Sequence, residues 1–251
     1  MPAKYLGQIV AILKDGKTQA ERALTDAHHA LQKPEMLSGI SREYQPLADD
    51  GEQLPAESKL VQVTVEEMIQ ATKKHLARLF DMTAARDFTN GPGGPGATAD
   101  VEIDGQVLVE NAPVPYLLWL ERQLQKLHTF TAKLPTLDPA TTWTLDDAVR
   151  GVYVSEVQET VRQVKQPRSF ELSPATKEHP AQVRAWEENV VVGKWRSVRY
   201  SGAVPQQRRA EILEQIEKAQ RAVHLAREQA NRTEALEPVI GKNLLDFVFG
   251  S

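Results

Sequence analysis

The stretch PYLLWLERQLQKLHTF, residues 115–130, is the most apolar helical pattern in this chain of 251 residues. Its apolar residues recur at intervals of three and four, as Leu117, Leu120, Leu124 and Leu127, with Leu118 and Trp119 alongside. This period is that of an α-helix with one buried face. Pro115 suits the first turn of such a helix. We therefore expect a helix over residues 115–133 at the centre of the hydrophobic core.

Three further helices are expected, over residues 1–33, 64–88 and 205–233. The first carries apolar and small residues at helical spacing, although Gly16 should weaken it by about 1 kcal/mol relative to alanine. The second opens with a capping-box pattern, in which Thr64 is the N-cap and Glu67 follows three residues later.

The remaining β-rich sequence predicts an α+β protein. Residues 151–202 are rich in Val, Trp and Tyr and are interrupted by Pro, Asn and Gly, which is typical of a mainly antiparallel sheet. A hairpin with an Asp104-Gly105 turn is expected near residues 100–110, and the polar residues 34–59 are expected to be a surface connection. The expected divisions are an N-terminal helix with its connection, a main α+β domain and an apolar tail, over 1–63, 64–236 and 237–251.

Composition excludes several classes of protein. The chain has no cysteine, which excludes disulfides, thiol catalysis, iron–sulfur clusters and cysteine zinc sites. A formal charge of −4 gives no overall attraction to nucleic acid or to an anionic membrane. The apolar stretch 9–13 is too short for a signal peptide, and no run reaches the ~18–20 apolar residues of a membrane span. We expect a cytoplasmic protein without a membrane segment.

Several segments resemble, when taken together, an uncharacterised family of bacterial proteins, a domain of unknown function. These segments are VPYLLWLERQL (114–124), LPTLDP (134–139) followed by Trp143, ATKEHPAQ (175–182), VVVGKW (190–195), SGA (201–203) and AREQAN (226–231). The resemblance covers the chain from about residue 64 onward. It implies a bacterial intracellular origin and no activity, so it assigns no site residue.

The stretch ATKEHPAQ is the candidate for catalysis, because it places Lys177, Glu178 and His179 side by side. Adjacent side chains of an extended segment point to opposite sides, so these groups would not converge on a substrate. Pro174 and Pro180 bracket the stretch and favour a rigid turn. The turn is therefore the preferred interpretation, and an enzyme of unknown type with a site at 177–179 is the alternative.

The other motifs that carry chemistry are absent. There is no HExxH helix, no Gly-x-Ser-x-Gly elbow, no dinucleotide fingerprint and no phosphate-binding loop, since NGPGGPGA (90–97) lacks the Lys-Ser/Thr pair. No metal and no cofactor is expected. A zinc or di-metal site assembled across helices stays open as an alternative.

Basic and aromatic residues mix in the predicted sheet. Residues 150–200 contain nine Lys/Arg and six acidic residues. The candidate nucleic-acid contacts are Arg184, Lys194, Trp195, Arg196 and Arg199, because single-strand binding sheets combine cations with stacking aromatics. The competing interpretation is an ordinary amphipathic sheet whose tryptophans belong to the core. Nucleic-acid binding is therefore the alternative function.

The apolar C-terminal tail is the strongest indication of a partner. Its large side chains, Ile240, Leu244, Leu245, Phe247 and Phe249, lie close together near the end of the sequence. They either pack on their own domain or dock into another chain. With the stripe Leu6, Ile9 and Leu13 of the first helix, they predict a non-catalytic intracellular assembly protein. We expect a homo-oligomer or a larger protein assembly.

Overall fold

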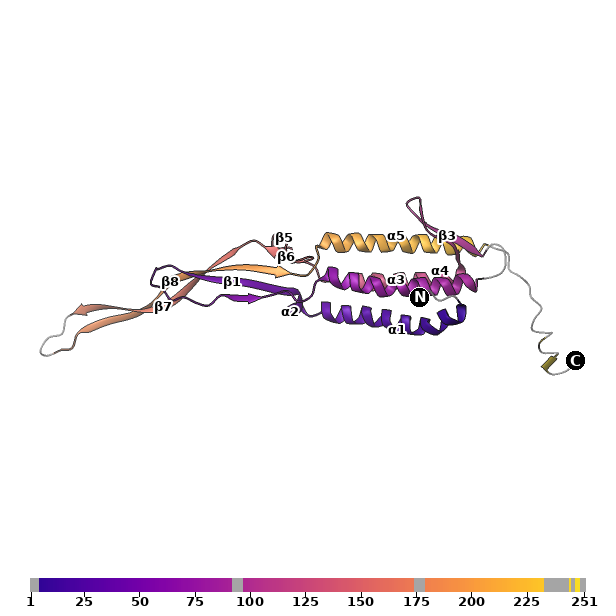
Figure 1. Ribbon diagram of the computed structural model, residues 1–251. Helices are drawn as coiled ribbons and strands as arrows, with labels where there is room; N and C mark the ends of the chain where they lie inside the picture. Colours follow the sequence, from indigo (N-terminus) through magenta and orange to yellow (C-terminus); the bar gives the residue numbers. More distant parts are fainter. Residues whose placement is uncertain (1–4, 92–96, 174–178, 233–243, 245–246, 249–251) are drawn as a thin grey trace. The chain divides into compact units, whose positions relative to one another are not determined.

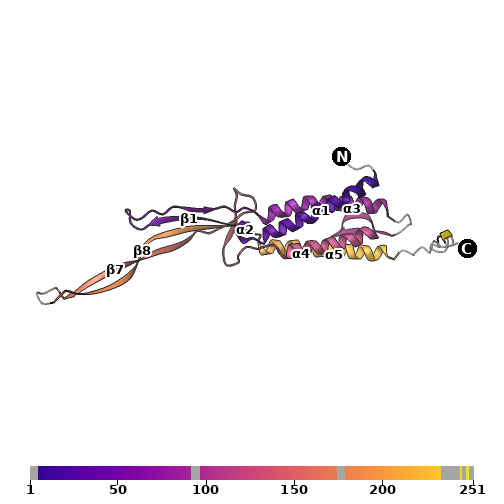
Figure 2. The same ribbon diagram turned by 90° about the horizontal axis from the view of Figure 1, so that it is seen from below.

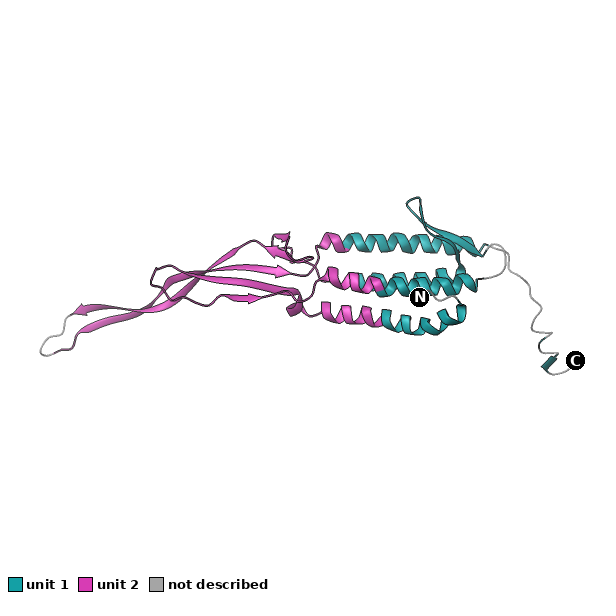
Figure 3. Ribbon diagram, in the orientation of Figure 1, with its two compact units in different colours: residues 1–20, 75–132, 210–251 teal, residues 21–74, 133–209 magenta. Residues whose placement is uncertain are grey.

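The computed structural model describes residues 5–91, 97–173, 179–232, 244 and 247–248, and it combines helices with antiparallel sheets (Figure 1). The expected α+β class is confirmed. Two compact units divide the chain (Figure 3). Unit 1 takes residues 1–20, 75–132 and 210–251, and unit 2 takes residues 21–74 and 133–209. The expected domain ranges follow the chain, whereas each unit combines separate stretches of it.

Unit 1 has a helical core. It contains α4 (Val114–Ala132), most of α5 (Gln206–Ala230) and parts of α1 (Leu6–Leu31) and α3 (Val65–Thr89). Buried side chains of α4 and α5 form one cluster with the neighbouring hairpin, namely Val101, Ala112, Tyr116, Leu117, Leu120, Leu124, Ala222, Val223, Ala226 and Ala230. The central place predicted for residues 115–133 is confirmed. Leu118 is the exception, since it is exposed and lies away from the buried face.

Gly16 is a point of close approach within unit 1. A Cβ atom at this position would collide with the terminal methyl group of Met82 on α3. The glycine that weakens the helix therefore makes room for the packing of α3. Leu6, Ile9 and Leu13 are half-buried and precede Gly16 and Ala20 along the same helical face.

The predicted hairpin is also confirmed in unit 1. It consists of β3 (Thr98–Ile103) and β4 (Gln106–Pro113), which pair antiparallel. Asp104 and Gly105 join them with φ values of 51° and 81°. Two positive φ angles in a two-residue loop are the mark of a type I′ turn, which the Asp-Gly dipeptide favours.

Unit 2 is built on one antiparallel sheet. Its strands are β1 (Ser38–Pro46), β2 (Glu57–Lys59), β5 (Trp143–Leu145), β6 (Tyr153–Ser155), β7 (Gln158–Ser173) and β8 (Gln182–Ser201). Their order is β2-β1-β8-β6-β5, and β7 pairs with β8 on the same side as β6. The sheet predicted over residues 151–202 is present as β6, β7 and β8.

The prediction that residues 34–59 form a surface connection is wrong for most of the range. Residues 34–37 are the short helix α2 (Pro34–Leu37), and β1 pairs with β8 from Ser38 opposite Ser201 to Pro46 opposite Gly193. The sequence of β1 is polar, with Ile40 and Tyr44 as its large apolar residues. The residues of β1 have low strand propensity. They form a strand because the backbone of β1 is hydrogen-bonded to β8.

The capping box at the start of α3 is confirmed within unit 2. The backbone N–H of Glu67 donates to Thr64 Oγ1 at 3.2 Å, and the backbone N–H of Thr64 donates to Glu67 Oε2 at 3.3 Å. Thr64 is buried, so these reciprocal bonds satisfy polar groups that have little access to water.

Candidate functional site

The β7–β8 ribbon extends beyond the end of β1 in unit 2 (Figures 1 and 2). The last residue of β1 to pair with β8 is Pro46, opposite Gly193. The β7–β8 ladder continues to Ser173 opposite Gln182. In the part of the chain that the structure describes, residues 182–191 of β8 therefore pair with β7 alone. Their other edge, which we call the β8 edge, is a row of backbone groups available to another strand.

One side of this ribbon combines aromatic and charged residues. Arg168 lies opposite Trp186, and Phe170 lies opposite Arg184. Directly opposed residues share a face, and every second residue along a strand returns to it. We call this the aromatic face, defined by Val164, Gln166, Arg168 and Phe170 of β7 and by Arg184, Trp186, Glu188 and Val190 of β8. Phe170 is 61% exposed and Trp186 is 46% exposed.

The part of the ribbon that extends beyond β1 is electrically balanced. Between residues 163–173 and 182–191, three cations accompany three carboxylates. Arg168 Nε lies 3.0 Å from Glu188 Oε2, and Lys165 Nζ lies 3.1 Å from Glu187 Oε2. Among the residues described, no carboxylate pairs with Arg184. This part of the ribbon thus carries no net positive charge that would attract a phosphate backbone.

The predicted nucleic-acid contacts do not form one surface. Lys194 and Arg196 lie on one face of β8, where both approach Glu159 at 3.4 Å and 3.6 Å. Trp195 and Arg199 occupy alternate positions and face the opposite side. Arg199 is partly buried and donates from Nη2 to Thr141 Oγ1 at 2.8 Å. Of the five candidates, only Arg184 lies on the β8 edge.

Trp195 belongs to a stack of rings and guanidinium groups. Arg42 Cζ lies 4.1 Å from the centre of the Trp195 ring, and the Tyr44 ring lies 5.1 Å from it. Arg162 then covers the other ring at 5.5 Å from the centre of Tyr44, and its Nη1 donates to Glu52 Oε2 at 3.0 Å. The hydrogen bond to Glu52 raises the pKa of Arg162 above its ordinary value, so this guanidinium stays charged.

A small depression of about 410 Å³ adjoins this stack. It is lined mainly by apolar side chains of β1, β7, β8 and the connection after β1, including Tyr44, Leu47, Val164, Val191 and Val192. Sequence reasoning missed the depression because Leu47 and Val191 are far apart in the chain. The glycine in VVVGKW, Gly193, was the available signal, since it marks the place where Tyr44 packs closely on β8.

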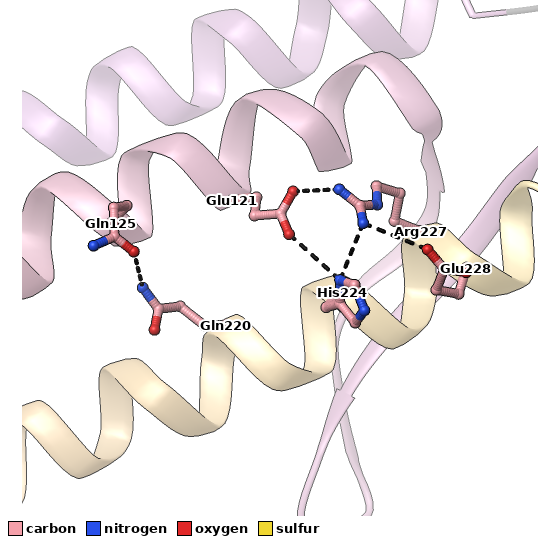
Figure 4. Close-up of polar contacts among 6 residues, drawn as sticks. All are labelled: Glu121, Gln125, Gln220, His224, Arg227 and Glu228. Carbon is pink, nitrogen blue, oxygen red and sulfur yellow. Dashed lines mark hydrogen bonds and ion pairs between the residues drawn. The ribbon is translucent and has the colours of Figure 1, made fainter.

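A second polar site joins α4 to α5 in unit 1 (Figure 4). Arg227 Nη1 donates to Glu121 Oε2 at 2.7 Å, and His224 Nδ1 lies 3.5 Å from Glu121 Oε1. Gln220 Nε2 donates to Gln125 Oε1 at 3.3 Å along the same pair of helices. An open groove of about 700 Å³ runs over these residues.

The geometry of this groove favours a structural role. Glu121 Oε2 accepts the hydrogen bond from Arg227, while His224 Nδ1 lies 3.1 Å from Arg227 Nη2 and accepts from this guanidinium. The partly buried pair of Glu121 and Arg227 joins α4 to α5, and a bidentate-capable guanidinium fixes the carboxylate in place. Sequence reasoning missed the cluster because Glu121 and Arg227 belong to different helices and no motif links them.

Among the core residues that the structure describes, Tyr116 has the pKa that is shifted furthest from its ordinary value. Burial, together with the charges of Asp81 and Asp87, raises the pKa of the Tyr116 hydroxyl to about 12. Asp87 is itself buried and accepts a hydrogen bond of 2.7 Å from Arg86 Nε. Tyr116 therefore remains protonated at neutral pH and does not supply a base there.

The remaining predictions lie mainly outside the described residues. Lys177 and Glu178 of the stretch ATKEHPAQ are outside them, so the expected turn at 177–179 stays a prediction. Ile240, Leu245 and Phe249 are outside them as well, whereas Leu244 and Phe247 are exposed. Within the described ranges, no group of three or more His, Asp or Glu side chains is placed to hold a metal ion. No helix there is both long and apolar enough to cross a membrane.

The comparison with protein families identifies the chain's relatives. The profile of a family of unknown function, DUF7873, matches residues 3–251. The chain belongs to DUF7873. The match also includes residues 3–63, which the resemblance noted from the sequence did not cover. Comparisons of this DUF7873 chain with curated proteins and with solved structures gave no match.

Proposed function

We propose that this DUF7873 protein is a non-catalytic interaction protein that self-associates, and that the β7–β8 ribbon is its principal binding surface. The observation that carries the proposal is the exposure of large apolar side chains on this ribbon. Besides Phe170 and Trp186, Val161, Leu172 and Val183 are exposed. Aromatic anchors of this kind dominate the binding energy of protein interfaces.

The backbone of the ribbon supports the same proposal. An exposed strand edge is a template for another strand, and the hydrogen bonds of strand addition give affinity without a deep pocket. Burial of apolar surface adds roughly 25 cal/mol for each Å² removed from water. The aromatic face and the β8 edge thus offer both contributions to one partner.

The C-terminal tail is a second surface in the proposal. Leu244 and Phe247 are exposed, and Phe247 reaches 87%. On α1, by contrast, Leu6, Ile9 and Leu13 are half-buried, while Val10 and Ile12 are exposed. We therefore retain the tail as a self-association surface. If α1 also contributes, we propose that Val10 and Ile12 take part in the contact in addition to Leu6, Ile9 and Leu13.

The mass of the full chain in solution tests the proposal. We expect an oligomer by light scattering, and we expect the variant Phe170→Ser/Trp186→Ser to have a lower mass. Leu60→Ser is the matched control, because Leu60 is an exposed leucine of unit 2 outside the ribbon. A wild-type chain that is monomeric at high micromolar concentration would contradict the proposal.

Nucleic-acid binding is a second candidate, favoured by the combination of Arg184, Phe170 and Trp186 on the aromatic face. Bases stack on exposed aromatic rings, and arginine adds a cation. The balanced charge of the ribbon beyond β1 argues against it. Fluorescence anisotropy with mixed-sequence single strands at low salt tests it. Binding that weakens steeply with salt and is lost in Arg184→Ala would support this candidate, and the absence of binding would exclude it.

We also propose a bacterial cytoplasmic location, which the segments resembling bacterial proteins support. Fractionation of the host cell, with detection of the untagged chain by antibody, tests this. Recovery of the chain in the membrane or periplasmic fraction would contradict it.

A further inference from the structure

The two outer edges of the β7–β8 ribbon differ in their capacity to pair. Pro167 lies in the β7 ladder opposite Glu187. Proline has no backbone N–H, so it fits in a strand only where its nitrogen points away from the paired strand. The nitrogen of Pro167 therefore points to the outer edge of β7. Residues 182–191 of β8 contain no proline.

We propose that the β8 edge pairs with the β8 edge of a second copy of the chain, antiparallel, about a two-fold axis through Trp186. The inference rests on the proposed self-association and names its surface and register. A two-fold axis perpendicular to a sheet keeps each side chain on its own face. Only registers that oppose residues of the same face are then compatible with the symmetry.

Charge selects one register among these. With Trp186 on the axis, Arg184 of each copy lies opposite Glu188 of the other, which pairs both charges of the aromatic face. In a register centred on Glu187 or Glu188, that glutamate lies opposite the same glutamate of the second copy. In a register centred on Arg184, two arginines lie opposite each other. A register centred on Ala185 leaves Glu188 opposite Gln182, without a cation. Like charges directly opposed across strands are destabilising.

The length of the edge sets the limits of the pairing. It begins at Gln182 and ends before Gly193, where β1 occupies the edge and Leu47 N donates to Val192 O at 3.0 Å. Nine residues, 182–190, fit between these limits when Trp186 is central. The two exposed Trp186 rings meet at the axis and lose contact with water.

The outer edge of β7 prevents the dimer from adding further copies. The paired ribbons form a four-stranded sheet whose outer strands are the two copies of β7. Both outer strands carry Pro167, which offers no N–H to a further strand and so discourages addition. The geometry thus gives a dimer with closed symmetry instead of an open fibre.

A charge exchange tests the register. In Arg184→Glu, two glutamates oppose each other at both ends, and in Glu188→Arg two arginines do. Each variant alone should dissociate at least about ten times more readily than the wild type in sedimentation experiments. An equimolar mixture should recover the dimer, because a carboxylate then faces a guanidinium at both ends of the pairing. Glu188 also pairs with Arg168, so Glu188→Gln and a thermal melt control for folding.

Cysteine cross-linking tests the register centred on Trp186 without changing Trp186 itself. Ala185 lies opposite Glu187 of the second copy, and opposed Cα atoms of an antiparallel pair are about 4.5–5.5 Å apart, within disulfide range. Since the chain has no cysteine, Ala185→Cys and Glu187→Cys each introduce a single thiol. We expect rapid disulfide formation in a mixture of the two variants and slow formation in either alone.

The outcomes separate this inference from the proposed function. An oligomeric wild type whose mass is unchanged in both charge variants, or whose mixed cysteine variants fail to cross-link, overturns the register and leaves self-association standing. A monomeric wild type overturns both. Recovery of the dimer in the mixed charge variants, with cross-linking in the mixed cysteine variants, supports both.

Discussion

The hydroxyl of Tyr44 occupies the space that any side chain at Gly193 would need. A Cβ atom built on Gly193 would collide with this hydroxyl and would lie 2.7 Å from the carbonyl oxygen of Gln45. Tyr44 is buried and packs against Trp195, so its ring cannot move without disturbing the ring stack of unit 2.

Gly193→Ala should therefore destabilise the protein. We expect a loss of about 1–3 kcal/mol in the free energy of unfolding, as for other overpacked sites, measured by urea denaturation. Gly7→Ala is the control, because a Cβ atom at Gly7 meets nothing within 4 Å, and alanine should stabilise α1 slightly. If the two variants had the same free energy of unfolding, the packing of Tyr44 would not require a glycine at position 193.

Thr64→Ala removes the side-chain acceptor of the capping box. The N–H of Glu67 then loses its partner at the start of α3, and we expect a loss of about 1 kcal/mol. Thermal unfolding measures the change. Thr64→Ser keeps the hydroxyl and should restore most of the stability, whereas a serine variant as unstable as the alanine variant would point to the lost methyl group instead.

Glu121→Gln tests the link between α4 and α5. The change removes the charge that holds Arg227, and since both groups of this pair are partly exposed we expect a loss of only about 1 kcal/mol. Glu228→Gln is the matched control, because Glu228 meets Arg227 at the longer distance of 3.4 Å and should contribute less. Chemical denaturation that ranked Glu228→Gln as the more damaging change would contradict the structural role of Glu121.

Alkaline pH should destabilise the protein through Tyr116. Its pKa is about 12 in the folded chain and about 10 in an unfolded chain. The unfolded chain therefore loses this proton first, so the stability contribution present below pH 10 is lost as the pH rises from 10 to 12. Two pKa units correspond to about 2–3 kcal/mol.

The measurement is the free energy of unfolding at pH 9 and pH 11 for the wild type and Tyr116→Phe. The phenylalanine variant should lose less stability over this interval, because it has no proton to release. Tyr5→Phe serves as the control, since Tyr5 is exposed. An identical pH dependence in wild type and Tyr116→Phe would remove Tyr116 as the cause.

The elements foreseen from the sequence are those decided by neighbouring residues. The stripe of leucines in α4, the Thr64–Glu67 capping box and the Asp104-Gly105 turn each depend on contacts within a few residues. Strand β1 escaped prediction because its partner β8 lies far along the chain and its own residues are polar. The Glu121–Arg227 pair and the covering of Trp195 by Arg42 depend on tertiary packing in the same way.

The candidate surface was foreseen only in part. Mixed cations and aromatics did mark β8, but the sequence did not show that Glu159 holds Lys194 and Arg196 or that Tyr44 packs on Trp195. Those partners, together with Thr141 for Arg199, engage four of the five predicted contacts in interactions within the chain. Arg184 differs because β1 ends before it, a fact that depends on where another strand stops.

The pairing of Ser38 with Ser201 has a consequence for biosynthesis. Strand β1 leaves the ribosome early, but its partner β8 follows only after most of the chain has been made. The β7–β8 ribbon needs only a short connection and can close as soon as it emerges, whereas β1 must wait. A polar strand exposes little apolar surface while it is unpaired, so the composition of residues 38–46 suits a strand whose partner is made late.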